Sequence, residues 1–558
     1  MMEAILSKSK TNTNTNTTMR RSYSHLSLSK LLDSDDEESP DGTIRRATIG
    51  ESVDDVVRIR TGLLRSNTLN RVSVTNWAET VEADIKQFRY PETVEEVIDL
   101  VKAHPKIRCS GALHSCAPLV ASEGIILSLT KLDKIISIDP TTRIVKMQSG
   151  VRIHTLCEAL APYGLAVGTL GTIDWQTISG AVMTGTHGGA LTVPSLHDYI
   201  KSYTLVKPDG EIIKVERDTQ LNLFRAMAPS MGVFGAVIEL EMEAVPLQLL
   251  EARMISIPSS DLIDRFDDVM KSNKYARVVV YPSIGKATIW TANPVASREA
   301  AVANGAKDNP GYTNFRNEKE KDMLKEYLVL CNNNEFEKAD DVLERVLESQ
   351  LSRLKHYVGQ YNHILCLERN NGIPHADIEF NFDYNKHNEV LRAVENYSDS
   401  NRIPYYNYEI RTTKQDDAML SCCHGRDAMW IDFQAKADVS KEYFGEMECA
   451  LKHIGYRKHW AKGLDNTDPT YLVQQFPRVA EFVKLMKSFD PTGKFRNKQA
   501  ESWFEVMDTL LNKNEAEEEI AKIMNKIKPE LMEIQAISDE KKDAYCSEEK
   551  NETLCLES

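Results

Sequence analysis

The stretch GLAVGTLGTIDWQTISGAVMTGTHGG, residues 164–189, is the part of the chain that decides the fold. Glycine, serine and threonine dominate it, at Gly168, Gly171, Thr172, Ser179, Gly180, Thr184, Gly185, Thr186, Gly188 and Gly189. Glycines let backbone amides come close to an anion, and the hydroxyl groups add hydrogen-bond donors. Apolar residues such as Leu170 and Val182 punctuate the segment, which indicates a packed loop rather than a linker. We interpret it as a loop that holds a ligand with a diphosphate.

A second loop of small residues is SGALHSCAPLV, residues 110–120, between the strand-like KIRC and the apolar GIILSL. His114 stands in its middle, and a lone histidine in such a loop more often caps a turn than binds a ligand. No two glycines of the chain stand two residues apart, so the G-x-G-x-x-G fingerprint of a Rossmann fold is absent. The Walker-type phosphate loop is absent as well.

Size and composition narrow the class of protein. The 558 residues predict two or three domains, and 42% hydrophobic with 27% charged residues is globular. A net charge of -15 argues against nucleic-acid binding, and no apolar run is long enough for a transmembrane helix. Ten scattered cysteines and no secretory signal pattern predict an intracellular protein. The compartment stays unassigned, whether cytoplasmic or at a mitochondrial or endoplasmic-reticulum membrane, and peripheral membrane association stays open.

The amino-acid composition of the chain changes at Asn76. Residues 1–73 are polar, acidic or low in complexity and predict disorder. From PETVEEVIDLVKAHP onward, a helix is followed by two hairpin patterns, KIISIDPTTRIVKMQ and IKSYTLVKPDGEIIKVE. Residues 248–482 mix long polar helices with strand-like runs, and residues 505–558 read as a charged helix with an acidic tail.

The motifs PETVEEV, SGALHSCAPLV, LTKLDKIISID, VRIHTLCEALAPYGLAVGTLGTIDWQTISGAVMTGTHGG and GVFGAVIELEMEAV occur in that order. Together they resemble the FAD-binding half of the vanillyl-alcohol oxidase superfamily, and within it the sugar-1,4-lactone oxidases and their alditol oxidase relatives. The resemblance implies an α+β fold with a two-subdomain PCMH-type FAD-binding domain at residues 74–247. It further implies a cap domain of antiparallel sheet covered by helices at 248–482, and a segment at 483–504 that returns to the FAD domain.

The resemblance implies FAD as cofactor, bonded covalently through His114, whose place in the tight loop is thereby explained. It puts the diphosphate beside the first loop and the rest of the cofactor beside the glycine-dense stretch. The implied cofactor-binding residues are His114, Ser110, Gly111, Ala112, Ser115, Gly168, Gly171, Thr172, Ser179, Gly180, Thr184, His187 and Ile238, with His187 in a structural role and Ile238 acting through its backbone. Relatives often have glycine where this chain has Leu113.

Three motifs of the second half carry the candidate chemistry. YNYEIRTT alternates like a strand, so Glu409 and Arg411 share one face, although a surface ion pair is the ordinary interpretation of such a pair. YRKHWAKGL places His459 and Lys462 beside a tryptophan, and FDPTGKFRN follows. The family carries E-x-R, H-W-[AG]-K and D-P-x-x-x-F-x-N in this order. Glu379 in DIEFNFDY aligns loosely with a strand that borders the substrate pocket of relatives.

The resemblance implies oxidation of an alcohol beside a lactone carbonyl, with hydride passing to flavin N5 and O2 reduced to H2O2. Arg411 would polarise the reacting oxygen and Glu409 would orient Arg411 or hold a hydroxyl. Lys462, with a pKa lowered by burial and Arg411, and His459 are the two candidate bases. The alternatives are an alditol oxidase, a lactone dehydrogenase with another acceptor, and a non-catalytic flavoprotein or scaffold. No metal site is expected.

Overall fold

The structure is a computed structural model that describes residues 46–49, 57–62, 71–76, 78, 80–85, 87–367, 375–463 and 468–511. Most of the segment expected to be disordered, residues 1–73, lies outside these ranges, as does most of the charged tail at 505–558. The described strands that fall in or beside the first of these segments pair in the order β1-β2-β3-β4: β1 (Arg46–Ile49), β2 (Val57–Gly62), β3 (Arg71–Thr75) and β4 (Glu82–Ile85).

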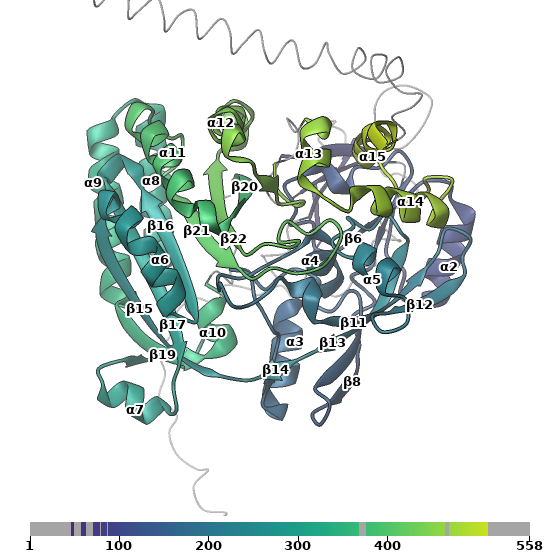
Figure 1. The fold of residues 1–558 in the computed structure, drawn as a ribbon, viewed down its shortest axis with the longest axis horizontal. Helices are drawn as coiled ribbons and strands as arrows, with labels where there is room; N and C mark the ends of the chain where they lie inside the picture. The colour runs from purple at the N-terminus through teal and green to yellow at the C-terminus, as the bar shows by residue number, and fades with distance from the viewer. Residues whose placement is uncertain are drawn as a thin grey trace, which may run out of the picture. The chain divides into compact units, whose positions relative to one another are not determined.

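Two sheets build the first half of the chain (Figure 1). A three-stranded parallel sheet has the order β5-β7-β6, from Gln87–Arg89, Ile125–Ser128 and Ile107–Ser110. A five-stranded antiparallel sheet has the order β12-β11-β13-β9-β8, from Ile212–Glu216, Ile200–Val206, Ala236–Glu243, Ile144–Gln148 and Ile135–Asp139. The helices of this half are α2 (Val94–Ala103), α3 (Ile153–Leu160), α4 (Ile178–Thr184) and α5 (Leu221–Met227), and β10 (Leu165–Ala166) pairs with β14 (Val245–Pro246).

Local sequence explains these elements, and both predicted hairpins are confirmed. The turn between β8 and β9 closes because the Asp139 carboxylate accepts from the backbone N–H of Thr141, at 2.8 Å. Helix α2 begins after Thr93, whose hydroxyl accepts from the N–H of Glu96. Helix α4 begins in the same way after Thr177, whose side chain accepts from the N–H of Gly180.

A nine-stranded sheet dominates the second half within the described residues, in the order β18-β19-β15-β17-β16-β21-β22-β20-β23. Its strands are β15 (Leu249–Pro258), β16 (Tyr275–Tyr281), β17 (Lys286–Pro294), β18 (Lys307–Asp308), β19 (His356–Gln360), β20 (Ala376–Asp383), β21 (Tyr408–Thr413), β22 (Ala428–Ala435) and β23 (Arg457–Lys458). The α-helices described in the second half of the sequence are α6 (Leu262–Ser272), α7 (Arg298–Ala303), α8 (Glu318–Asn332), α9 (Phe336–Leu354), α10 (Tyr361–Leu365), α11 (His387–Ser400), α12 (Ala437–Leu451), α13 (Pro469–Gln475), α14 (Val479–Phe489) and α15 (Lys498–Leu511).

The central strands of this sheet alternate, and the two faces have different partners. Ile378 and Phe380 of β20, Ile410 of β21 and Ile431 of β22 pack with α6, α11 and α12 in one apolar core, and Figure 1 shows these helices beside the sheet. The opposite face carries polar residues at the alternate positions. A strand of this kind ordinarily exposes its polar face to water, but here that face is buried.

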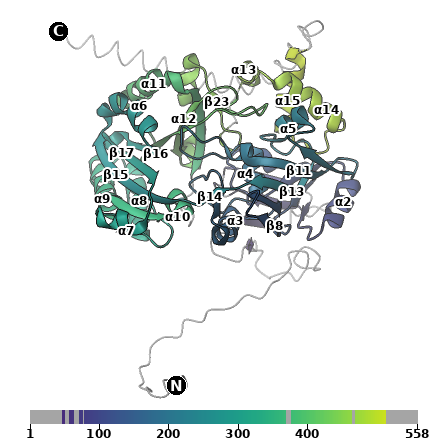
Figure 2. The ribbon, with the colours of Figure 1, turned by 60° about the horizontal axis from the view of Figure 1, so that its bottom comes forward.

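The chain returns to its first half after α14. The backbone N–H of Ile107 donates to Lys494, and the side chain of Asn497 donates to the carbonyl of Pro118. The buried Arg108 donates to three carbonyls from distant segments, those of Leu119, Phe495 and Met231, at 2.8, 2.6 and 2.7 Å. This arginine holds together the walls of the groove described next. Among the described residues, none of the helices has the length and apolar character of a membrane-spanning helix. Figure 2 shows α14, which precedes the returning segment, beside α5 of the first half.

Candidate functional site

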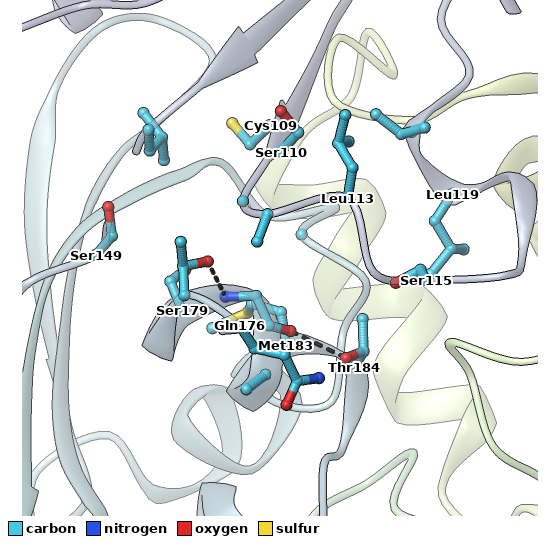
Figure 3. A pocket seen from close by; sticks show the side chains of 18 of the residues that line it. Cys109, Ser110, Leu113, Ser115, Leu119, Ser149, Gln176, Ser179, Met183 and Thr184 are labelled. Carbon is cyan, nitrogen blue, oxygen red and sulfur yellow. Dashed lines mark hydrogen bonds between the residues drawn. The ribbon is translucent and has the colours of Figure 1, made fainter. Parts of the chain in front are cut away.

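A groove in the first half brings together the two loops singled out in the sequence (Figure 3). It encloses about 940 Å³, including the part open to solvent, and one wall is the loop after β6 while the other is α4. Eight of the predicted cofactor residues line it: Ser110, Gly111, Ala112, His114, Ser115, Ser179, Gly180 and Thr184. The two segments therefore face one another, as the diphosphate interpretation requires.

Five predicted cofactor residues lie elsewhere. Gly168 packs against the ring of Tyr199, where a Cβ would come within 2.2 Å, so core packing explains that glycine. Gly171 lies beside the backbone of His187. Thr172 lines a second, smaller cavity, and Ile238 is buried in the core while its carbonyl accepts from Ser149. His187 belongs to the polar cluster described below.

Leu113 adopts the left-handed backbone conformation, with φ of 58°. Glycine adopts this conformation without strain, whereas a residue with a Cβ is destabilised in it by about 1 kcal/mol. This conformation gives a physical reason for the glycine that the resemblance led us to expect at this position, and here Leu113 adopts it. The side chain of Leu113 is buried and lines the groove (Figure 3).

His114 is held next to the second half of the chain. The backbone N–H groups of Cys116 and Ala117 both donate to the carbonyl of Ala461, at 2.7 and 3.1 Å. Burial, with Arg152 and Lys462 nearby, lowers the pKa of His114 to about 4. Its imidazole is therefore neutral at physiological pH, which is the nucleophilic form.

A polar cluster lies on the buried face of the nine-stranded sheet, at this end of the groove. Arg411 donates to the Glu379 carboxylate at 2.6 Å and lies 3.1 Å from the Glu409 carboxylate. The pair at Glu409 and Arg411, for which a surface ion pair was the ordinary interpretation, is thus buried within a network. Burial acts against the charged form of Glu379, but the Arg411 guanidinium holds its pKa well below the usual range, so it is ionised.

Lys462 lies beside two carboxylates of neighbouring strands. Its ammonium donates to Asp377 at 2.5 Å and is 3.7 Å from Asp432. Burial alone lowers the pKa of Lys462, but the two carboxyl groups raise it well above its ordinary value. The expectation that burial and Arg411 lower this pKa is therefore wrong, because the sequence does not show the two acidic neighbours. Lys462 is a cation here.

The two histidines of the cluster have different tautomers. The backbone N–H of Ala461 donates to Nδ1 of His459, so Nε2 of the neutral ring carries the proton. Nδ1 of His187 is 2.9 Å from the carbonyl of Gly188, which can only accept, so Nδ1 carries the proton and Nε2 has the lone pair. That lone pair lies 3.2 Å from the Glu379 carboxylate. The His187 ring also stacks on Trp430, with centroids 3.9 Å apart.

His187, Glu379 and His459 lie within 4.8 Å of one another through atoms that bind metals in other proteins. Their present hydrogen bonds do not suit a metal. The Arg411 guanidinium already contacts Glu379, and Nε2 of His459 carries a proton while Ala461 occupies Nδ1. The donor set fits a hydrogen-bonded cluster better than a metal centre.

A second cavity adjoins Arg411. It is lined by Thr169, Leu170, Thr172, Gly188, Gly189, Tyr275, Ala276, Arg277, Trp290, Leu365 and Arg411. Two guanidinium groups and two threonine hydroxyls in so small a space suit a ligand with several oxygen atoms. The Cβ that another residue would add at Gly189 would come 3.0 Å from the carbonyl of Ala276, so a side chain there would crowd this wall.

Comparison with known proteins finds a matching family model for each half of the chain. Residues 85–216 match the family model of an FAD binding domain, and residues 240–505 match that of D-arabinono-1,4-lactone oxidase. The chain resembles the FAD-dependent sugar-1,4-lactone oxidases in both halves. It is therefore an FAD-dependent oxidoreductase, and its fold is the expected α+β fold with an FAD-binding domain.

Two relatives match between 41% and 78% of this chain, at 22% to 29% identity. L-gulonolactone oxidase of Mus musculus is 22% identical over 462 residues, which are 78% of this chain and 98% of the relative. D-arabinono-1,4-lactone oxidase of Yarrowia lipolytica is 29% identical over 240 residues, 41% of this chain and 46% of the relative. Among solved structures, a solvent-stable cholesterol oxidase shares the fold, with a TM-score of 0.68, 17% identity, and coverage of 77% of this chain and 97% of the other.

The groove fits the FAD that the family implies. The hydroxyls of Ser110 and Ser149 are buried at its wall without a hydrogen-bond partner, so they are available to a polar ligand. Gly111 lets the loop pass against the helix, since a Cβ there would come within 2.0 Å of the Thr177 hydroxyl. Thr184, which also lines the groove, donates to the carbonyl of Gly180 within α4 (Figure 3).

The sequence did not single out Asp377, Asp432 or Arg277, and it gave Glu379 only as a loose alignment. The signal that was available is the alternation of DIEFNFD and MWIDFQA, which places Asp377, Glu379 and Asp432 on one face. Alternation alone does not tell a solvent-exposed polar face from a catalytic one. Only the packing of the first half against this sheet makes the distinction.

His459 makes the stability of the enzyme depend on pH. Burial lowers its pKa from 6.5 to about 3, so the unfolded chain binds a proton that the folded chain does not between these values. Because the unfolded state binds more protons there, the free energy of unfolding falls as pH falls from 6.5 toward 3. We expect His459→Gln to flatten this dependence by up to about 1.4 kcal/mol per pH unit. Chemical denaturation at several pH values in this window measures it, and equal slopes for the two proteins would contradict the assignment.

Proposed function

We propose that this protein oxidises a carbinol carbon of a sugar-1,4-lactone, giving an ascorbate-type product, with O2 reduced to H2O2. The observation that carries the proposal is the junction of the groove with the polar cluster. The backbone N–H groups of Cys116 and Ala117, two and three residues after His114, donate to the carbonyl of Ala461 in the H-W-A-K segment, so the cofactor end and the catalytic end of the site are joined.

FAD, when bound in the groove, supplies the acceptor for the hydride that leaves the substrate carbon. We propose that His114 carries it covalently, since this imidazole is neutral and lines the groove. Ser110 and Ser149 would hold polar groups of the cofactor. Lys462, which is a cation close to His114, would stabilise negative charge that develops at this end of the groove.

Arg411 would bind and polarise the reacting oxygen of the substrate from the second cavity. Glu409 and Glu379 hold its guanidinium from two sides, which fixes its direction before the substrate enters. His459 presents Nε2–H as a donor, so it fits the role of base less well than expected. The nitrogen with a lone pair is Nε2 of His187, and the hydroxyl proton would come to rest between it and Glu379.

A substrate panel tests the function. The purified holoenzyme is mixed anaerobically with sugar-1,4-lactones and with alditols, and bleaching of the flavin colour is followed. Oxygen uptake and peroxide release are then measured in air. We expect lactones to bleach the flavin and to release peroxide. Bleaching without peroxide would identify a dehydrogenase with another acceptor, and no bleaching by either class would refute the function.

A further inference from the structure

Glu409 joins two arginines at the second cavity. The same carboxylate oxygen lies 3.1 Å from Nε of Arg411 on β21 and 3.2 Å from Nε of Arg277 on β16. About 10% of each arginine side chain is exposed. Both guanidinium groups line the cavity, together with the hydroxyls of Thr169 and Thr172. Arg277 does not line the cofactor groove, so its place is at the substrate side of the site.

Two buried guanidinium groups side by side are destabilising unless each is well paired. Stability alone does not require this arrangement, since an apolar residue at position 277 would pack on Phe315, over whose ring the guanidinium lies at 5.9 Å. The Glu409 carboxylate forms an ion pair with Nε of each arginine and so holds the two planar groups close to one another. The arrangement brings two guanidinium groups to one small cavity, and the planar fork of a guanidinium group matches a planar pair of oxygen atoms.

This geometry distinguishes between the two substrate classes. A lactone presents its carbonyl and ring oxygens in one plane, whereas the hydroxyls of an open polyol lie on tetrahedral carbons and are not held in a plane. We propose that Arg277 is the specificity-determining residue of the site, and that it binds the planar ester group of a lactone while Arg411 binds the reacting oxygen. The inference rests on the proposed function and names the part of the substrate that Arg277 binds.

The test separates binding from chemistry in the holoenzyme. Anaerobic stopped-flow reduction of the flavin gives an apparent Kd and a limiting rate for L-gulono-1,4-lactone and for xylitol. For Arg277→Met we expect the apparent Kd for the lactone to rise about 10- to 100-fold, because one charge-assisted hydrogen bond is lost. The limiting rate should change by less than about threefold, and the xylitol constants should change little. Arg253→Met, which removes an exposed arginine of strand β15 in the same sheet, is the matched control.

Each outcome of this test either supports or overturns the role proposed for Arg277. A loss confined to lactone binding supports the proposal, whereas an equal loss for both substrates, or a loss in limiting rate alone, overturns it. If Arg277→Met does not fold with flavin, Arg277→Lys keeps the charge but removes the planar fork, and an unchanged lactone preference in that variant would equally overturn it. Failure of the wild-type enzyme to be reduced by either substrate would instead refute the proposed function.

Discussion

The Arg411→Ala enzyme is expected to keep its flavin and to turn over about 10²- to 10³-fold more slowly than the wild type. Arg411 lines the second cavity rather than the cofactor groove, so its removal leaves the predicted flavin contacts in place. It also removes the counter-ion of Glu379 and one of the two arginines at Glu409. The measurements are turnover with the best lactone of the panel and the ratio of flavin to protein absorbance.

Removal of Arg411 leaves a buried carboxylate without its cation, which destabilises a protein by about 3–5 kcal/mol. Turnover is therefore expressed per folded, flavin-bearing molecule. Arg411→Lys keeps the charge but loses the fork, so we expect it to fold better and still to lose most activity. Near-normal turnover in Arg411→Ala would remove this residue from the reaction.

The second large effect concerns His114. We expect the wild-type flavin to stay in the pellet when the protein is precipitated with acid, and the flavin of His114→Ala to move entirely to the supernatant. The reason is that the proposed bond has one imidazole as its only attachment to the chain, so its loss is complete rather than graded. His453→Ala removes an exposed histidine far from the groove and serves as the control.

Two results would count against the assignment of His114. Wild-type flavin that is released by acid would show that no covalent bond exists. Pellet-bound flavin in the His114→Ala variant would show that another residue carries it. Retention of non-covalent FAD by the variant is expected, because Ser110, Ser149 and Thr184 remain at the groove.

Much of the fold was predictable because its signals are local. The two hairpins follow from alternating strands around DPTT and KPDG, and α2 from the spacing of apolar residues after Thr93. The groove was predictable in part, since its glycines and serines are concentrated in two loops. Gly168 shows the limit, because a glycine needed for packing against Tyr199 has the same appearance in the sequence as one that approaches a ligand.

The catalytic cluster was harder to predict because its charges come from different strands. Glu409 and Arg411 are two residues apart and were visible, whereas Asp377, Asp432 and Arg277 lie on three other strand positions that only the sheet register brings near. The direction of the Lys462 pKa depends on these partners, so the sequence led to the opposite expectation. The prediction of this cluster was therefore limited by the long-range pairing of strands, which the sequence does not show, and not by weak local signals.

The contacts of Arg108 make a wall of the cofactor groove depend on a segment far downstream of the two loops. One of its three acceptors belongs to Phe495, so a wall of the groove is held by a residue close to the end of a 558-residue chain. During synthesis, the earlier glycine and serine loops leave the ribosome long before this residue exists. This contact behind the groove wall therefore forms only after Phe495 has been synthesised, and a product shortened before Asp490 leaves Arg108 without one of its carbonyls.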